Sequence, residues 1–489
     1  MCGIVGILDP GREVAFDLYR AAMALQHRGQ DGAGLVTFQE RFYHHSDLGL
    51  LAEVFRNQDL GRFRGKMGVA HLRYATSGDG TRGECQPFMV SFPFGLSLVH
   101  NGNLTNDALQ RRKLAGTGRL VNSSSDSDTI LHVLAHHLAK FERTRLEPGL
   151  ILDAVRATMS DLEGAYSVVV AIANHGLLAF RDPHGIRPLV MGRREQALLF
   201  ASESVALETV RADLWRDVQP GEAVLVTMDG QIHARQIAEP RSAHCSFEYI
   251  YLARPESVLD GQSVSAVRER LGESLARRFD GTADVAFDVP SSAEDAAVAF
   301  AREARIPYRK GIRRNHYVAR SFIAANPSLR REVAALKFHL ERRVISGQRV
   351  AVVDDSIVRG TTAQALVSRL RRKGAEHVAF FSASPPVTHP CPYGVDMAIQ
   401  GDLLASRLDA EGIRHTLGVD HLQYQSQEDL EAALGNRPSC TACFTGCYPT
   451  DVSPATLSQI ERQRSLISGD AQGDRLERDP ELSREGASC

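Results

Sequence analysis

The chain has 489 residues, of which 43% are hydrophobic and 24% charged, and its formal net charge is -2. That length exceeds what one hydrophobic core usually serves, so two domains are expected. The charge excludes a global field that favours nucleic acid or an acidic membrane. No run approaches the roughly 20 apolar residues of a membrane span, and the start lacks the pattern of a signal peptide. We therefore expect a cytoplasmic protein whose eight cysteines stay reduced.

The texture of the chain changes near residue 240. Before it, short apolar runs broken by Gly, Asn and Asp predict a strand-rich domain, with a hairpin formed by residues 165–172 and 176–180. From about 260, strands alternate with helices, which predicts a parallel sheet closed by right-handed crossovers. We predict domains at residues 2–240 and 241–450, then a C-terminal helix and polar tail at 451–489. The expected helices of the second domain are 263–278, 293–305 and 362–373, and its strands are 284–289, 349–353 and 377–382.

Cys2 directly follows the initiator methionine. Removal of Met1 leaves a thiol and a free α-amine on one residue. The amine, whose ordinary pKa is roughly 7.7 to 8.0, can then serve as the base for its own thiol. A cysteine at position 2 by itself could be a chance residue at a frayed terminus. However, residues 2–6 are apolar with two glycines, which indicates the start of a buried strand and favours a nucleophile.

Three further segments carry groups that suit amide chemistry. Residues 26–31 form a polar turn after a helix, and residues 71–76 place Arg73 on a strand, where it can grip a carboxylate with two hydrogen bonds. Residues 100–103 end an apolar strand with the side-chain amide of Asn101 beside the backbone N–H of Gly102, a candidate oxyanion hole.

These segments, with residues 180–189, resemble the glutaminase domain of the N-terminal-nucleophile amidotransferases in position and order. The resemblance implies that Cys2 attacks the side-chain amide of glutamine. It assigns catalysis to Cys2, Asn101 and Gly102, and glutamine binding to Arg28, Arg73, Thr76 and Asp126.

Residues 350–362 run from a strand through a polar loop into a helix. Backbone N–H groups, small hydroxyls and a helix N-terminus together suit a phosphate monoester, and Asp354 and Asp355 can accept hydrogen bonds from ribose hydroxyls. Neither the Walker nor the dinucleotide-binding glycine motif is present. The alternative is a surface turn whose Ser and Thr side chains only cap the helix. The segment resembles the phosphoribosylpyrophosphate (PRPP) motif of type I phosphoribosyltransferases.

With both domains in this order, residues 1 to about 450 resemble the amidophosphoribosyltransferase family. The resemblance implies an α+β N-terminal-nucleophile (αββα) glutaminase domain followed by an α/β type I phosphoribosyltransferase domain. Ammonia from glutamine would displace pyrophosphate from C1 of PRPP, giving 5-phosphoribosylamine for purine synthesis. The family resemblance further implies a homo-oligomer, either dimer or tetramer, with purine nucleotides as inhibitors. The implied PRPP-binding residues are Asp354, Asp355, Ser356, Arg359, Gly360, Thr361, Thr362, Arg314, Tyr317, Arg320 and Lys337, and the implied magnesium ligands are Ser292, Asp354 and Asp355.

The second site departs from the family pattern. The family's Val-Pro-Asp-Ser-Gly loop is here residues 289–293, with Ser291 and Ala293 in place of Asp and Gly. Ala319, Ala335 and His339 are further departures. These changes leave open a paralogue with another acceptor, or a degenerate, regulatory phosphoribosyltransferase domain.

Four cysteines from three distant segments form a possible metal site. Cys440 and Cys443 are separated by two residues, whereas Cys245 and Cys391 lie far away in the sequence. Four thiolates fit either a tetrahedral zinc ion or a cubane iron–sulfur cluster. The resemblance implies a [4Fe-4S] cluster, with a structural or oxygen-sensing role because neither reaction needs electrons. Cys85 is expected to be a core or loop residue.

Overall fold

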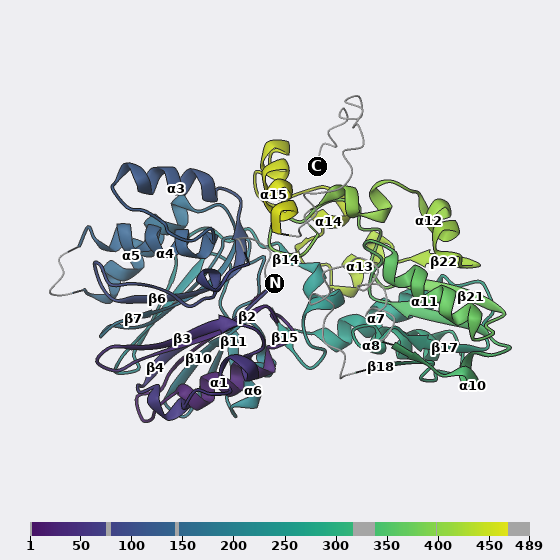
Figure 1. The fold of residues 1–489 in the computed structure, drawn as a ribbon, viewed down its shortest axis with the longest axis horizontal. Helices are drawn as coiled ribbons and strands as arrows, with labels where there is room; N and C mark the ends of the chain where they lie inside the picture. Colours follow the sequence, from purple (N-terminus) through teal and green to yellow (C-terminus); the bar gives the residue numbers. More distant parts are fainter. Residues whose placement is uncertain (1, 75–79, 142–145, 316–337, 398, 468–489) are drawn as a thin grey trace.

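The computed structural model describes residues 2–74, 80–141, 146–315, 338–397 and 399–467. Figure 1 shows two lobes, one built from the first half of the chain and one from the second, with α15 (Pro454–Ile467) beside their junction. Among the described residues, no helix combines the length and apolarity needed to cross a membrane.

The N-terminal lobe contains two stacked antiparallel sheets. The first sheet has seven strands in the order β11 (Asp213–Asp217), β9 (Val190–Arg194), β10 (Ala197–Ala201), β1 (Gly3–Leu8), β4 (Met67–Arg73), β2 (Gly32–Phe38) and β3 (Phe42–Leu48). The second has six strands in the order β13 (Ile232–Gln236), β12 (Glu222–Thr227), β8 (Gly176–Arg181), β7 (Gly164–Ile172), β6 (Leu96–Leu104) and β5 (Phe88–Val90).

The two sheets approach each other closely, and helices cover their outer faces. A Cβ atom at Gly6 would lie 2.5 Å from Val169 Cγ1 on the facing sheet, so glycine is needed at that crossing. The first sheet is covered by α1 (Ala15–Ala24), α2 (Leu51–Val54) and α6 (Ser204–Thr209), and the second by α3 (Asp107–Gly116), α4 (Asp126–Leu138) and α5 (Pro148–Asp161). This αββα order is the predicted fold class of the first domain.

The C-terminal lobe contains a four-stranded parallel sheet. The strand order is β17 (Val285–Asp288), β20 (Arg349–Asp354), β21 (His377–Ser382) and β22 (His421–Tyr424). One face packs on α7 (Val264–Arg277) and α8 (Glu294–Glu303), and the other on α11 (Thr361–Arg372) and α12 (Ala410–Leu417). The predicted α/β architecture of the second domain is therefore confirmed, with element bounds close to those expected.

Smaller elements connect the lobes and complete the second one. A π-helix at Glu248–Leu252, which the sequence analysis did not predict, lies between the two domains in the chain. Other short elements are β14 (His244–Cys245) with β23 (Ser439–Cys440), β15 (Val258–Leu259) with β16 (Gln262–Ser263), β18 (Ile312–Arg314) with β19 (Phe338–Leu340), α10 (Arg342–Ile345), α13 (Gln427–Ala433) and α14 (Ala442–Thr445).

The face of the parallel sheet toward α7 and α8 depends on an aromatic cluster. The Phe381 side chain is fully buried, with ring centroids 4.5 Å from Phe300 and 5.0 Å from Phe279. We expect Phe381→Ala to lower the free energy of unfolding by about 3–5 kcal/mol because it leaves a cavity. Urea denaturation followed by circular dichroism measures this loss. Phe16→Ala, at a 63% exposed position, is the control, and a loss below about 1 kcal/mol at Phe381 would contradict the packing argument.

Candidate active site

Cys2 lies at the start of β1, in the middle of the first sheet and next to the end of β6. Its backbone N donates a 3.2 Å hydrogen bond to Asn101 Oδ1, and its Sγ lies 3.8 Å from the Tyr74 carbonyl oxygen. Its own carbonyl accepts from Arg28 Nε at 3.0 Å. Three distant segments therefore converge on the predicted nucleophile.

The candidate oxyanion hole has the expected composition. Asn101 is buried, and among the described residues its Nδ2 has no hydrogen-bond partner, although Oδ1 of the same amide accepts from Cys2. Gly102 has a φ of 156°, and a Cβ there would lie 2.0 Å from the Ala165 carbonyl oxygen. Only glycine can therefore bring this backbone N–H into place. A donor that is buried and unpaired is costly unless a ligand completes it.

Arg73 and the turn that contains Arg28 lie against each other. Arg73 is the last residue of β4 and is buried. A Cβ at Gly29 would lie 2.4 Å from the Leu72 carbonyl oxygen, so the turn can reach the strand end only with glycine there. This close approach places the predicted carboxylate-binding arginine on the strand beside β1. Thr76 lies outside the described residues.

Asp126 begins α4, where the helix N-terminus favours a negative charge. Its Oδ2 accepts from the Leu104 backbone N at 2.9 Å, and its Oδ1 lies 3.8 Å from His100 Nδ1. Burial raises the pKa of Asp126, and the charge of His100 only partly offsets this effect. A bound ammonium would restore the ionised carboxylate. This environment suits the predicted contact with an α-ammonium group.

Arg28 differs from its predicted role. Its side chain is fully buried, its Nη1 donates to Glu203 Oε1 at 2.6 Å, and its Nη2 donates to Glu248 Oε1 at 2.8 Å. Its Nε donates to the Cys2 carbonyl. The guanidinium is thus committed to protein partners, so the contacts favour a role in positioning Cys2 over the predicted direct grip on glutamine.

The acidic pair of the predicted PRPP motif lies at the carboxyl end of β20. Ser292 Oγ and Ser356 Oγ both donate to the Asp355 carboxylate, the latter at 2.6 Å. Burial, reinforced by Asp355, raises the pKa of Asp354 well above its usual range, and burial also raises the pKa of Asp355. Two adjacent buried carboxylates are costly without cations or hydroxyl donors. They therefore mark a ligand site rather than a simple helix cap.

The loop after this pair forms an anion cradle at the start of α11. Gly360, the residue before the helix, has a φ of 75°, in the left-handed region that favours glycine. Arg359 forms a 3.2 Å ion pair with Asp402. Arg314 and Arg359 line one cavity together with Asp354 and Asp355. Thr361 and Thr362 are the first helical residues. Tyr317, Arg320, Lys337, Ala319 and Ala335 lie outside the described residues.

Three departures from the family pattern, at residues 291, 293 and 339, lie among the described residues, and the local backbone accommodates them. Ala293 has φ −89° and ψ 1°, so no left-handed conformation requires glycine there. Ser291 is exposed, and Ser292 still reaches Asp355. His339 is an exposed residue of β19. None of these changes removes the acidic pair or the helix N-terminus.

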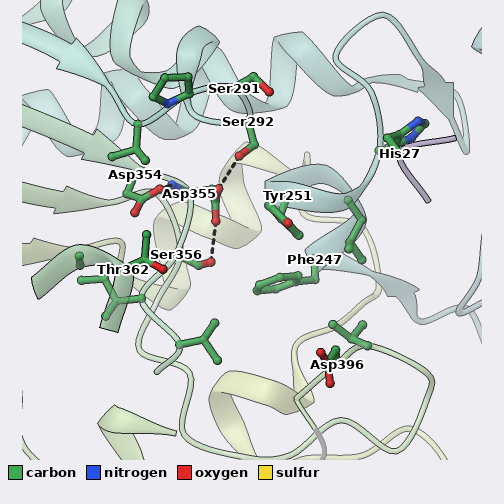
Figure 2. A pocket seen from close by; sticks show the side chains of 18 of the residues that line it. His27, Phe247, Tyr251, Ser291, Ser292, Asp354, Asp355, Ser356, Thr362 and Asp396 are labelled. Atoms are coloured by element: carbon green, nitrogen blue, oxygen red, sulfur yellow. Dashed lines mark hydrogen bonds between the residues drawn. The ribbon is translucent and has the colours of Figure 1, made fainter. Parts of the chain in front are cut away.

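One cavity of about 830 Å³ connects the two lobes. It is lined by His27, Arg28 and Tyr74 from the first lobe and by the acidic pair and anion cradle from the second. Figure 2 shows Phe247 and Tyr251 pointing into it, opposite Asp355 and Ser356. Sequence reasoning missed His27, Phe247, Tyr251 and Asp396, because the chemistry of such residue types becomes specific only when the fold brings them to one cavity.

The four predicted cluster cysteines line a second, smaller cavity. Parallel pairing of β14 with β23 places Cys245 beside Cys440. Burial raises the pKa of Cys245 to about 11 and that of Cys443 well above its usual range. Among the described residues, no three His, Cys, Asp or Glu side chains are arranged to share a single metal ion. Cys85 is buried elsewhere, in the first lobe, as expected.

The fold and the site define a two-domain glutamine amidotransferase with an N-terminal-nucleophile lobe and a type I phosphoribosyltransferase lobe. A family model described as "Glutamine amidotransferase domain" matches residues 71–209. Amidophosphoribosyltransferases from Pasteurella multocida, Escherichia coli and Bacillus subtilis are 43%, 40% and 38% identical, covering 96%, 95% and 93% of this chain and 97%, 96% and 95% of theirs. The chain belongs to the amidophosphoribosyltransferase family.

A solved structure agrees over both lobes. The B. subtilis glutamine PRPP amidotransferase complexed with ADP and GMP has a TM-score of 0.85 and 36% identity, covering 93% of this chain and 98% of that one. The protein is thus an enzyme that uses glutamine to aminate PRPP, releasing glutamate and pyrophosphate. The main interpretation of the sequence is favoured over a paralogue with a different acceptor.

The buried carboxyl of Asp126 should make glutamine binding sensitive to pH. Because burial raises its pKa, the carboxyl should take up a proton above the ordinary aspartate range as pH falls, which weakens binding of the glutamine ammonium. We expect KM for glutamine, measured at saturating PRPP, to rise as pH falls. Asp126→Asn should raise KM for glutamine by about 30- to 1000-fold, equal to about 2–4 kcal/mol.

Steady-state kinetics across pH measure both effects. Asp128→Asn changes a carboxylate on the same first helical turn, which faces His132, and should leave KM for glutamine within about twofold. A pH-independent KM in the wild type would contradict the assignment of Asp126.

Proposed function

We propose that the glutamine half-reaction uses Cys2, exposed by removal of Met1, as the nucleophile. The α-amine accepts the thiol proton, and the thiolate attacks the amide carbon of glutamine. Asn101 Nδ2 and the Gly102 N–H stabilise the resulting oxyanion. The amide nitrogen then takes the proton and leaves as ammonia, and water hydrolyses the thioester to glutamate. The hydrogen bonding of the Asn101 side-chain amide carries this proposal. Its Oδ1 accepts from the Cys2 backbone N, whereas its Nδ2 has no partner among the described residues and is available to the oxyanion.

Two further side chains are proposed to bind the α-carboxylate and the α-ammonium of glutamine. Arg73 binds the α-carboxylate of glutamine from the end of β4, and Asp126 binds the α-ammonium from the start of α4. Thr76 stays a predicted glutamine contact. These groups hold the amide at Cys2 without taking part in proton transfer, so they act chiefly on KM.

For the transfer half-reaction, we propose that ammonia attacks C1 of PRPP. The C1–O bond breaks, pyrophosphate leaves with the bonding electrons, and the attacking nitrogen loses one proton. Asp354 and Asp355 accept hydrogen bonds from the ribose hydroxyls, and Ser356, Gly360, Thr361 and Thr362 hold the 5′-phosphate at the helix N-terminus. Arg314 and Arg359 contribute positive charge, and Tyr317, Arg320 and Lys337 stay predicted PRPP contacts. The cavity shared by both lobes supports direct passage of ammonia.

Magnesium is the proposed metal of this second site. Carboxylate and hydroxyl oxygens are the ligands it prefers, and Asp355 lies between the hydroxyls of Ser292 and Ser356. The raised pKa values of Asp354 and Asp355 fit a site that is completed by a cation. The ion would neutralise charge on the departing pyrophosphate.

A [4Fe-4S] cluster is the proposed occupant of the cysteine cavity. Four thiols from three segments line it, and the buried guanidinium of Arg187 lies beside Cys245 and Cys391. A single zinc ion needs sulfurs about 2.3 Å from one centre, whereas a cubane spreads four thiolates over a larger volume. The cluster would hold the segments of Cys245, Cys391, Cys440 and Cys443 together.

The B. subtilis relative was solved with ADP and GMP, which supports purine nucleotides as inhibitors of this enzyme. We also infer a homo-oligomer, dimer or tetramer, and a cytoplasmic location, where thiols stay reduced.

Cys2→Ala tests the division of labour between the sites. We expect it to abolish pyrophosphate release with glutamine, because the nucleophile is lost, but to retain ammonia-dependent release within about threefold. Pyrophosphate and glutamate are assayed together with PRPP and magnesium present. Glutaminase activity that survives in the variant would refute the nucleophile. A wild-type enzyme that releases glutamate but no pyrophosphate would refute PRPP as acceptor.

Metal and sulfide analysis of anaerobically purified protein tests the cluster. We expect about four iron and four sulfide per chain, and loss of both in Cys443→Ser. Cys85→Ser is the matched control, because Cys85 is a buried thiol outside the cavity, and it should retain the iron. Stoichiometric zinc without sulfide would contradict the proposal.

A further inference from the structure

Two buried carboxylates hold Arg28 next to Cys2. Glu203 Oε1 accepts from Nη1 at 2.6 Å, and Glu248 accepts from Nη1 at 3.0 Å and from Nη2 at 2.8 Å. The remaining nitrogen, Nε, donates to the Cys2 carbonyl at 3.0 Å. Any displacement of the guanidinium is therefore transmitted directly to the backbone of the nucleophile.

Glu248 differs from Glu203 in its place in the chain. Glu203 follows β10 within the glutaminase lobe, whereas Glu248 is the first residue of the π-helix between the two lobes. It also accepts from Arg187 Nη1 at 3.2 Å, so it bridges two guanidinium groups. Glu248 is buried, as are both arginines, so water cannot replace a missing partner.

The π-helix is anchored to the second lobe at its other end. Arg268 in α7 donates from Nε to the Tyr249 carbonyl at 2.8 Å and from Nη2 to the Ala253 carbonyl at 2.7 Å. Tyr251 of the helix and the preceding Phe247 line the large cavity, where Figure 2 shows both rings opposite Asp355. π-Helical turns are rare and occur frequently at functional sites.

We propose that Glu248 is a positioning residue for the glutaminase reaction, supplied from outside the glutaminase lobe, that sets the Cys2 backbone through Arg28. This inference rests on the proposed role of Cys2. It assigns Glu248 no contact with glutamine, PRPP or ammonia. With Glu248 neutralised, Arg28 keeps its charged contact with Glu203 but loses the one with Glu248, and the Arg28–Cys2 contact loosens.

Glu248→Gln tests the proposal because it keeps the size and removes the charge. We expect kcat with glutamine to fall at least tenfold, KM for glutamine to stay within threefold, and ammonia-dependent pyrophosphate release to stay within twofold. The rate of Cys2 alkylation by iodoacetamide should also change at least threefold, with Cys2→Ala giving the background. Glu248→Asp, which keeps the charge on a shorter side chain, should recover part of the lost kcat.

Glu256→Gln is the matched control. Glu256 lies on the same segment and pairs with Arg254 at 2.7 Å, but its side chain is half exposed. It should match the wild type in every assay. A parallel loss of glutamine- and ammonia-dependent activity in Glu248→Gln and Glu248→Asp would indicate a merely structural role and overturn the proposal, as would unchanged kcat and alkylation. Glutamine-dependent activity that survives Cys2→Ala would instead refute the proposed function, independently of Glu248.

Discussion

The fold and the active site meet in a buried network of two guanidiniums and two carboxylates. Arg28 and Arg187 share Glu248, and Arg28 also binds Glu203, all with fully or almost fully buried side chains. Although burial opposes the charge of both partners, the carboxylates hold the pKa of Arg28 above its ordinary value, and His27 and Arg28 hold that of Glu203 well below. Removing one partner from such a network costs about 3–5 kcal/mol.

The buried network fixes the relative positions of its segments more than it stabilises the fold. Buried ion pairs often contribute little net stability compared with apolar packing, but the loss of one partner leaves an uncompensated buried charge. The turn of Arg28, the strand start at Cys2 and the π-helix of Glu248 must therefore be in place together. The proposed nucleophile is consequently held from both sides of the domain boundary, although its own motif spans only residues 2–6.

In the second site, by contrast, two buried carboxylates lie together. Asp354 and Asp355 lie side by side at the end of β20, and for Asp354 no cation within the described residues lies close enough to form an ion pair. Their raised pKa values reflect buried, uncompensated negative charge, which a cation bound together with the substrate can neutralise. One cavity is thus lined by Arg28 and Tyr74, which contact Cys2, and by the acidic pair of the second lobe.

The sequence by itself determined the two-domain order and the residues whose chemistry is local. Cys2, Asn101, Gly102 and the Asp354–Thr362 segment could be read because each lies in a short motif at a strand end, where backbone and side chain act together. The roles of Glu203, Glu248, Phe247 and Tyr251 were decided only by the tertiary structure. Their partners are distant in the sequence, and an isolated glutamate or aromatic residue carries no local signal. Arg28 shows the difference most clearly: the family resemblance implied a substrate contact, but the fold surrounds its guanidinium with carboxylates from two other segments, and burial then commits it to them.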